Sequence, residues 1–300
     1  MEVKTGELKA CFNALIRQNL PEDAFGQLEK KLNEASETQA KMKFNLLFSS
    51  IPRLVGKSPM TITPEQQALL KACRKGFNPG SWTIDRFCRV YLLLHLDPSG
   101  GQQEYIARVE ELFSAAEVYE QVALYSALPL YRFPEAFRFR TTDGIRTNIT
   151  DVFDAIALDN PYPFDYLEEA AWNQMVLKAL FMQRPIYRIY GIDQRANASL
   201  ARILSDYAHE RWSAGRQVSP ELWRCFGPFM DEKLFADIRR LLAGNDPCRE
   251  EAAVLACYDS DHPEAKELLS AHPGLAGKAE RGELTWDTLG LACERGAFYK

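Results

Sequence analysis

The chain has 300 residues, of which 46% are apolar and 26% are charged. These fractions lie near the averages for globular proteins, so they exclude a disordered chain, a collagen-like fibre and a coiled-coil rod. A net charge of -5 gives no general attraction to phosphate backbones. We therefore expect no nucleic acid partner, although a local basic patch is compatible with an acidic total.

Apolar residues recur with the 3.6-residue period of an amphipathic helix along the whole chain, and no run of strict alternation indicates a strand. The sequence therefore predicts an all-α fold. Thr63, Ser219 and Asp246 each precede a proline, an arrangement typical of a helix cap and first turn. The expected helices are residues 5–19, 22–48, 64–75, 83–96, 102–116, 117–131, 147–158, 165–183, 197–214, 220–226, 231–243, 248–258, 262–271 and 285–295.

The spacing of these helices suggests one extended array. A helix with its loop takes about 21 residues, and a pair about 40, which is the pitch of HEAT-type repeats. We expect a single elongated domain over 1–300, an irregular α-solenoid or HEAT-like helical array, with helix pairs at 231–300. Because no repeat motif recurs, a generic multi-helix bundle remains the alternative. The stretches 52–64 and 141–147 interrupt the pattern and are expected to be loops.

The chain has no apolar run of the roughly 20 residues that span a bilayer, so we expect a protein that is not integral to a membrane. The first ten residues include Glu2 and Glu7 and no following apolar run, which argues against a secretory signal. These features predict a cytoplasmic protein.

The sequence carries no motif of a cofactor or metal site. Its seven cysteines form no CxxC pair, and Cys88 and Cys257 lie in apolar stretches where a reduced thiol packs as a small hydrophobe. Glycine-rich phosphate loops, HExxH and GxSxG are absent, and there are four histidines. We therefore expect neither a metal nor a cofactor.

Residues 165–183 are the most unusual predicted helix. Prolines at 161 and 163 are expected to hold the preceding link extended, and acidic residues at 165, 168 and 169 suit a helix N-terminus. From Met175 to Met182 the only charge is Lys178, so the helix is expected to be central and buried. Asn173 and Gln174 would then need partners, either on neighbouring helices or on a ligand.

The next helix, residues 197–214, carries candidate catalytic side chains. Arg202, Asp206, His209 and Ser213 recur at spacings of four, three and four, which places them on one face. Asp206 would pair with Arg202 and orient His209, which gives an acid–base imidazole. A solvated face with weak ion pairs explains the same pattern without catalysis.

Arginine clusters flank this region. Residues 131–146 interleave aromatic residues with arginines, a composition found both in sites for anions or single strands and at helix edges. A second cluster, Arg184, Arg188 and Arg195, lies near the acidic start of the helix 165–183, and mutual ion pairing would account for both. Arg195, Arg202 and Arg211 are candidates for binding an anionic ligand, together with Asn173 and Gln174.

The stretch 160–229 resembles the EboA family, helical proteins of bacterial gene clusters linked with metabolite traffic. It extends into a family-like core over 148–230. The resemblance implies a protein that acts with other products of its cluster, including a membrane prenyltransferase-like protein, in moving a secondary metabolite. It supplies no catalytic residues. The matching strings are NPYP at 160–163, AWNQMVLKALF at 171–181, RIYGIDQRAN at 188–197, DYAHERW at 206–212 and PELWRCFGPF at 220–229.

Two functions follow from the sequence. The first is a non-enzymatic adaptor or metabolite-binding protein that works at the surface formed by residues 165–183 and 197–215. The alternative is an enzyme of unrecognised type that uses His209 and Asp206 on a small anionic substrate. In that case the side chains must converge on one cavity.

Overall fold

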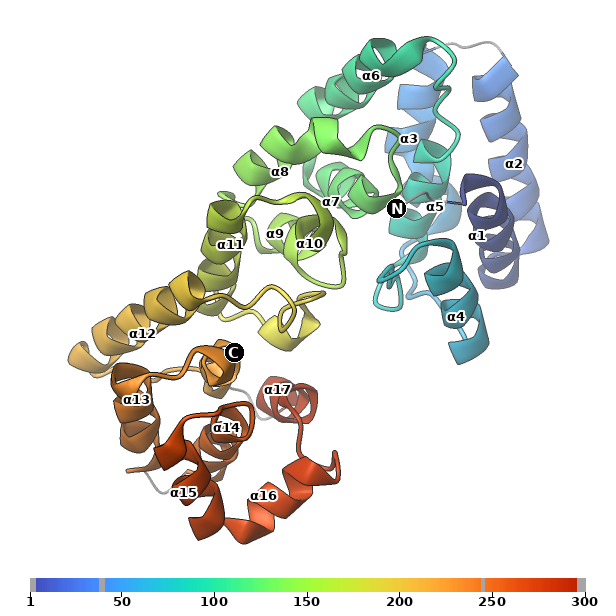
Figure 1. Cartoon of the computed structure of the whole chain (residues 1–300). Helices are drawn as coiled ribbons and strands as arrows, with labels where there is room; N and C mark the ends of the chain where they lie inside the picture. Colours follow the sequence, from blue (N-terminus) through green and yellow to red (C-terminus); the bar gives the residue numbers. More distant parts are fainter. Residues whose placement is uncertain (1–3, 38–40, 244–245, 296–300) are drawn as a thin grey trace. The chain divides into compact units, whose positions relative to one another are not determined.

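The structure is a computed structural model of the chain, and it describes residues 4–37, 41–243 and 246–295 (Figure 1). It divides into two compact units, Met1–Leu167 and Glu168–Lys300, which we describe separately. Every regular element in the described ranges is a helix, which confirms the all-α class. The single elongated domain, the HEAT-like stacking, the core at 148–230 and the pairs at 231–300 stay predictions.

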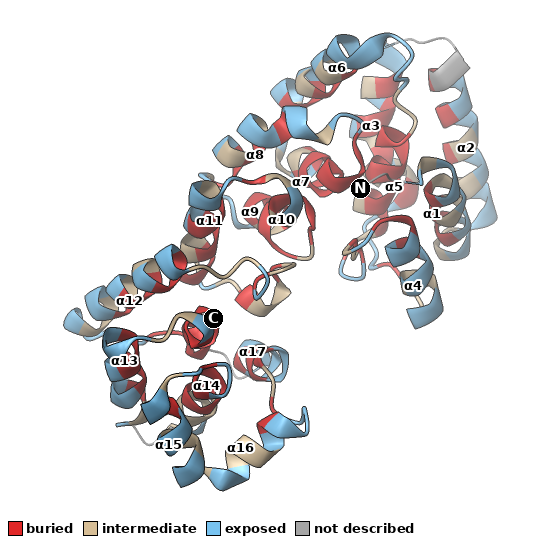
Figure 2. Cartoon of the chain, in the orientation of Figure 1, coloured by how far each residue is buried: buried red, intermediate tan, exposed pale blue. Residues whose placement is uncertain are grey.

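The N-terminal unit is built around α5, whose residues are all buried except Arg86. This helix packs against α1, α3 and α7, and the rings of Phe12 and Phe87 stack with centroids 4.1 Å apart. Figure 2 shows the burial on α5 and α7. The elements are α1 (Thr5–Asn19), α2 (Glu22–Glu37), α3 (Lys41–Val55), α4 (Pro64–Cys73), α5 (Ile84–Leu93), α6 (Gly101–Ala115), α7 (Val118–Ser126), α8 (Arg138–Gly144), α9 (Thr150–Ala157), α10 (Tyr162–Tyr166) and the 3₁₀ helices η1 (Leu128–Leu130) and η2 (Pro134–Phe137).

The C-terminal unit centres on α14, whose residues 252–257 are buried. Small side chains such as Ala252, Ala253 and Ala256 let η4, α13, α15, α16 and α17 pack around it. The elements are α11 (Glu169–Phe181), α12 (Ala198–Ser213), α13 (Glu232–Leu242), α14 (Pro247–Tyr258), α15 (Pro263–Ala271), α16 (Pro273–Glu280), α17 (Trp286–Arg295) and the 3₁₀ helices η3 (Ile186–Arg188), η4 (Pro220–Cys225) and η5 (Gly227–Phe229).

The predicted caps are present. Thr63 accepts from the backbone N–H of Gln66, whose side chain accepts from the backbone N–H of Thr63, a complete capping box. Ser219 and Asp246 likewise accept backbone N–H bonds at the starts of η4 and α14. These local signals therefore locate three helix starts correctly.

Several predicted boundaries are wrong. The expected helix 22–48 is two helices, because α2 ends at Glu37 and α3 begins at Lys41. The expected loop 52–64 starts only after Val55, because α3 continues through Pro52 to that residue. Helices α8 and α16 were not expected, and residues 220–225 form a 3₁₀ helix, not an α-helix.

The link before α11 is not extended. Pro161 has helical dihedral angles, and Pro163 lies in the first turn of α10, where a missing N–H costs nothing. The Asn160 side chain accepts from the backbone N–H of Tyr162 at 2.9 Å and so starts this turn. As a result, α11 begins at Glu169 and not near Asp165.

The cysteines and the helix lengths agree with the sequence analysis. All seven cysteines are free. Burial raises the pKa of the Cys88 thiol, and it raises the pKa of the Cys257 thiol to about 12. Both behave as packed thiols. Among the described helices, none combines the length and the apolar character needed to cross a bilayer.

Candidate functional site

The two asparagines at the start of α11 and α12 pair with each other. Asn173 is buried and donates through Nδ2 to Asn197 Oδ1 at 3.2 Å, while Asn197 Nδ2 donates to Asn173 Oδ1 at 2.9 Å. Asn197 Oδ1 also accepts from the N–H of Leu200 and caps α12. Asn173 therefore has the partner on a neighbouring helix that its burial requires.

The other predicted ligand-binding residues do not line one cavity. Gln174 and Arg202 are exposed. The Arg195 guanidinium lies over the Trp172 ring, 4.6 Å from its centroid. Arg211 donates through Nε and Nη2 to the carbonyl of Gln217, at 3.0 and 2.8 Å. The hollow beside it holds about 10 Å³, room for about one water molecule.

His209 has a different carboxylate partner from the one expected. Its Nε2 lies 2.6 Å from Oδ1 of Asp237 on α13, a buried residue that also accepts from Ser205 Oγ at 2.6 Å. Asp206 points to Lys233, whose Nζ is 3.1 Å from Oδ1. The i, i+3 spacing placed Asp206 on the correct face, but α13 brings a better-buried carboxylate to the ring.

The arginine clusters are also occupied by groups of this chain. Arg140 pairs with Glu110 and lies over Phe113. Arg188 lies 3.7 Å from Glu294. Asp165 likewise pairs with Arg74. The expected mutual pairing of the arginine cluster with the acidic start of α11 stays a prediction.

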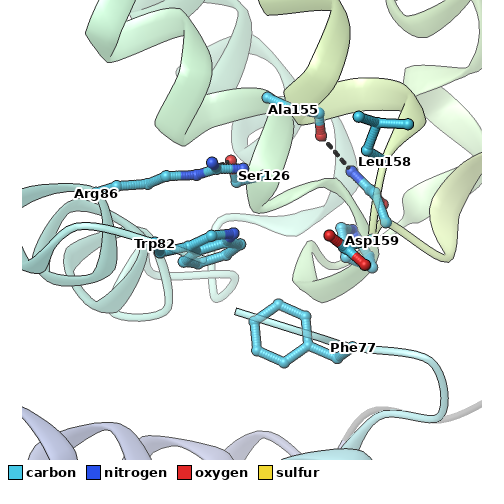
Figure 3. A pocket seen from close by; sticks show the side chains of 9 residues that line it. Phe77, Trp82, Arg86, Ser126, Ala155, Leu158 and Asp159 are labelled. Atoms are coloured by element: carbon cyan, nitrogen blue, oxygen red, sulfur yellow. Dashed lines mark hydrogen bonds between the residues drawn. The ribbon is translucent and has the colours of Figure 1, made fainter. Parts of the chain in front are cut away.

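One hollow in the N-terminal unit is closed by packing (Figure 3). Arg86 lies over the Trp82 ring, 4.5 Å from its centroid, and donates through Nε to Ser126 Oγ at 2.8 Å. Asn160 donates to the carbonyls of Tyr125 and Ala155, at 3.1 and 2.8 Å. No space for a water molecule remains. The asparagine of the NPYP string therefore has a structural role.

A cavity of about 600 Å³ opens elsewhere in the N-terminal unit. This volume lies within the roughly 300–1,000 Å³ typical of small-molecule sites. Its walls come from α1, α2, α3, α6 and the segment 95–100 that follows α5. The lining residues are Lys9, Ala35, Lys41, Phe44, His95, Leu96, Asp97, Pro98, Ser99, Gly100, Glu104 and Arg108.

Most polar groups of this cavity are fixed by the chain itself. Asp97 accepts from the backbone N–H and the hydroxyl of Ser99, at 2.8 and 2.6 Å, and these bonds lower its pKa. Arg108 lies 3.2 Å from Glu111 and over the Phe44 ring. The wall therefore presents aliphatic, aromatic and cationic side chains to the cavity.

Lys9 and His95 differ from these groups. Among the described residues, no hydrogen bond or ion pair is recorded for Lys9 Nζ, and burial and the charge of Arg132 lower its pKa. His95 Nδ1 lies 2.9 Å from the carbonyl oxygen of Tyr91, so Nδ1 carries the proton and Nε2 is left for another group. Burial, with a smaller contribution from Lys9, lowers the pKa of His95. An anion here would favour the protonated forms of both side chains.

The comparison with known families decides the identity of the chain. A family model described as metabolite traffic protein EboA matches residues 8–227. The chain belongs to the EboA family. No curated protein and no solved structure matches it. The EboA match confirms the resemblance drawn from 160–229 and extends it over the N-terminal unit, including the whole wall of the cavity.

Sequence reasoning missed the residues of this EboA cavity. Lys9, His95 and Arg108 come from three separate segments, and no local spacing connects them. In the described part of the chain, no group of three or more histidine, cysteine or acidic side chains could hold a metal ion. The cavity wall combines cationic side chains such as Lys9 with the apolar side chains of Phe44 and Leu96.

Proposed function

We propose that this EboA protein is a non-enzymatic, metabolite-binding component of its traffic system, and that the cavity of the N-terminal unit binds a small organic anion. The observation that carries the proposal is a cavity of about 600 Å³ with a half-buried Lys9 on its wall, whose Nζ has no hydrogen bond or ion pair with the described residues. Ligand sites combine apolar walls with a few placed polar groups, as here.

The charges of the wall favour an anion. Lys41 and Arg108 lie 3.9 and 3.2 Å from Glu111, and the Asp97 carboxylate is bonded to Ser99, whereas Lys9 Nζ has no partner among the described residues. Phe44 and Leu96 would contact the apolar part of the ligand. In this proposal the protein acts as an adaptor in the cytoplasm. It would pass the bound metabolite to other proteins of its gene cluster, including the membrane prenyltransferase-like protein that the resemblance implies.

A fluorescent amphiphilic anion tests the proposal. Anilinonaphthalenesulfonate should bind the full chain, and Lys9→Ala should weaken its affinity about fivefold or more, because a charge-assisted hydrogen bond is lost. The matched control is Lys71→Ala, which removes an exposed lysine from α4 of the same unit. Equal affinities for the wild type and Lys9→Ala would contradict the proposal.

A second candidate function, acid–base catalysis, is favoured by one observation. The buried Asp237 carboxylate fixes the half-exposed His209 ring through Nε2. Beside His209, the Trp212 ring carries the Arg240 guanidinium 4.2 Å from its centroid. In this alternative, His209 with Asp237, and not with Asp206, would act on an anionic substrate held by Arg240.

A further inference from the structure

The outer side of α3 carries two exposed large apolar side chains one helical turn apart. Met42 and Leu46 are 81% and 70% exposed. They lie one turn apart, and Ser49 and Arg53 continue the same side at spacings of three and four. The opposite side of α3 packs into the core through buried residues such as Phe48 and Ile51. The helix is therefore held rigidly while its apolar edge faces outward.

The charged side chains of α3 and of the segment that follows it are all cationic, and Glu111 of α6 lies 3.9 Å from one of them, Lys41. Residues 41–64 contain Lys41, Lys43, Arg53 and Lys57 and no aspartate or glutamate, in a chain whose net charge is -5. By helix geometry, Lys41 and Lys43 flank the edge on its two sides, and Arg53 lies at its end. Among the described residues, no ion pair is recorded for Lys43 or Arg53. Exposed apolar side chains beside cations without an ion pair, here Lys43 and Arg53, are typical of helices that lie on anionic membranes.

We infer that the outer side of α3, defined by Met42, Lys43, Leu46, Ser49 and Arg53, docks on a bilayer with anionic headgroups. Met42 and Leu46 would enter the boundary between headgroups and acyl chains, and the cations would meet the phosphates.

The size and charge of the surface favour a membrane over a protein partner. The edge extends over about 17 Å of a helix about 10 Å wide, which gives about 170 Å², far less than the roughly 800 Å² per partner that a stable protein interface buries. A lipid surface needs no such area, because each cation near an anionic leaflet adds to the attraction.

Vesicle sedimentation with the full chain tests this inference independently of the cavity. The protein should bind vesicles of phosphatidylcholine mixed with phosphatidylglycerol at low salt, leave them at high salt, and ignore pure phosphatidylcholine. Met42→Glu with Leu46→Glu should weaken partitioning about tenfold or more. The double variant Lys43→Gln with Arg53→Gln, which keeps Met42 and Leu46, should weaken partitioning by a similar factor.

A matched variant controls for net charge. Leu69→Glu with Lys71→Gln changes the charge by the same amount as the Met42 and Leu46 pair, on an exposed part of α4. It should keep nearly wild-type partitioning, and circular dichroism should show all variants folded. Equal loss in this control, equal binding to pure phosphatidylcholine, or no binding to the anionic vesicles at low salt would overturn the inference.

Discussion

The two compact units use their polar side chains differently. In the C-terminal unit, Asn173 pairs with Asn197, His209 with Asp237, and Arg224 with Asp193 and Asp287. In the N-terminal unit, Lys9 lies on the wall of a cavity of about 600 Å³, and its Nζ has no hydrogen bond or ion pair with the described residues. Polar groups that the chain itself satisfies stabilise the fold, whereas an unsatisfied cation on a preformed wall suits a ligand. Substitutions in the two units should therefore have separable effects.

The largest effect should follow Arg224→Ala. Arg224 is buried and donates through Nε and Nη2 to Asp193, at 2.5 and 2.7 Å, and through Nη1 to Asp287 at 2.8 Å. Breaking a fully buried pair costs about 3–5 kcal/mol, but both carboxylates here keep contact with water. We expect a loss of about 2–3 kcal/mol in the free energy of unfolding, measured by urea denaturation.

The control for this prediction is Arg216→Ala, an exposed residue of the same unit that should change stability by less than about 0.5 kcal/mol. Binding of anilinonaphthalenesulfonate by the folded Arg224→Ala protein should equal that of the wild type. Weaker binding without a change in stability would break the comparison between the units.

Asn197→Ala should have a smaller effect on stability. It removes the cap of α12, worth about 1 kcal/mol, and leaves the buried Asn173 amide unpaired. We expect a total loss of about 2 kcal/mol by urea denaturation. Asn197→Asp keeps the acceptor for Leu200 and Asn173 and should lose about half as much. No loss in Asn197→Asp would show that the donor bond to Asn173 contributes nothing, whereas equal losses in the two variants would show that the cap of α12 contributes nothing.

The organisation into helices could be predicted from the sequence, but the site could not. The 3.6-residue period and caps such as Thr63 depend on neighbours along the chain, and the structure confirms them. The partner of His209 depends on tertiary packing, because Asp237 is 28 residues away and on another helix. The wall of the cavity likewise joins Lys9 to His95 and Arg108, a set that only the packing of α1, α5 and α6 brings together.

The smallest effect concerns the pH dependence of stability through His95. Burial lowers its pKa in the folded protein below the ordinary value of 6.5, so the unfolded chain binds a proton more readily. The stabilisation of the neutral ring is therefore complete above about pH 6.5 and decreases as the pH falls below it. In urea denaturation, the free energy of unfolding of the wild type should therefore fall more than that of His95→Gln as the pH drops below about 6.5.

A bound anion should reverse this trend. It stabilises the imidazolium beside Lys9, so the sulfonate should bind more tightly as the pH falls, and this gain should disappear in His95→Gln. If His95→Gln binds the sulfonate with the same pH dependence as the wild type, the anion lies away from this side chain. That result would weaken the contrast between a ligand-binding N-terminal unit and a C-terminal unit whose polar groups pair with each other.

The most direct test of the central claim is a crystal structure of the full chain with bound anilinonaphthalenesulfonate. We predict that the sulfonate lies beside Lys9 Nζ and His95 Nε2, with its rings against Phe44 and Leu96. A probe bound at Trp212 and Arg240 in the C-terminal unit, with the cavity of the N-terminal unit empty, would contradict the account.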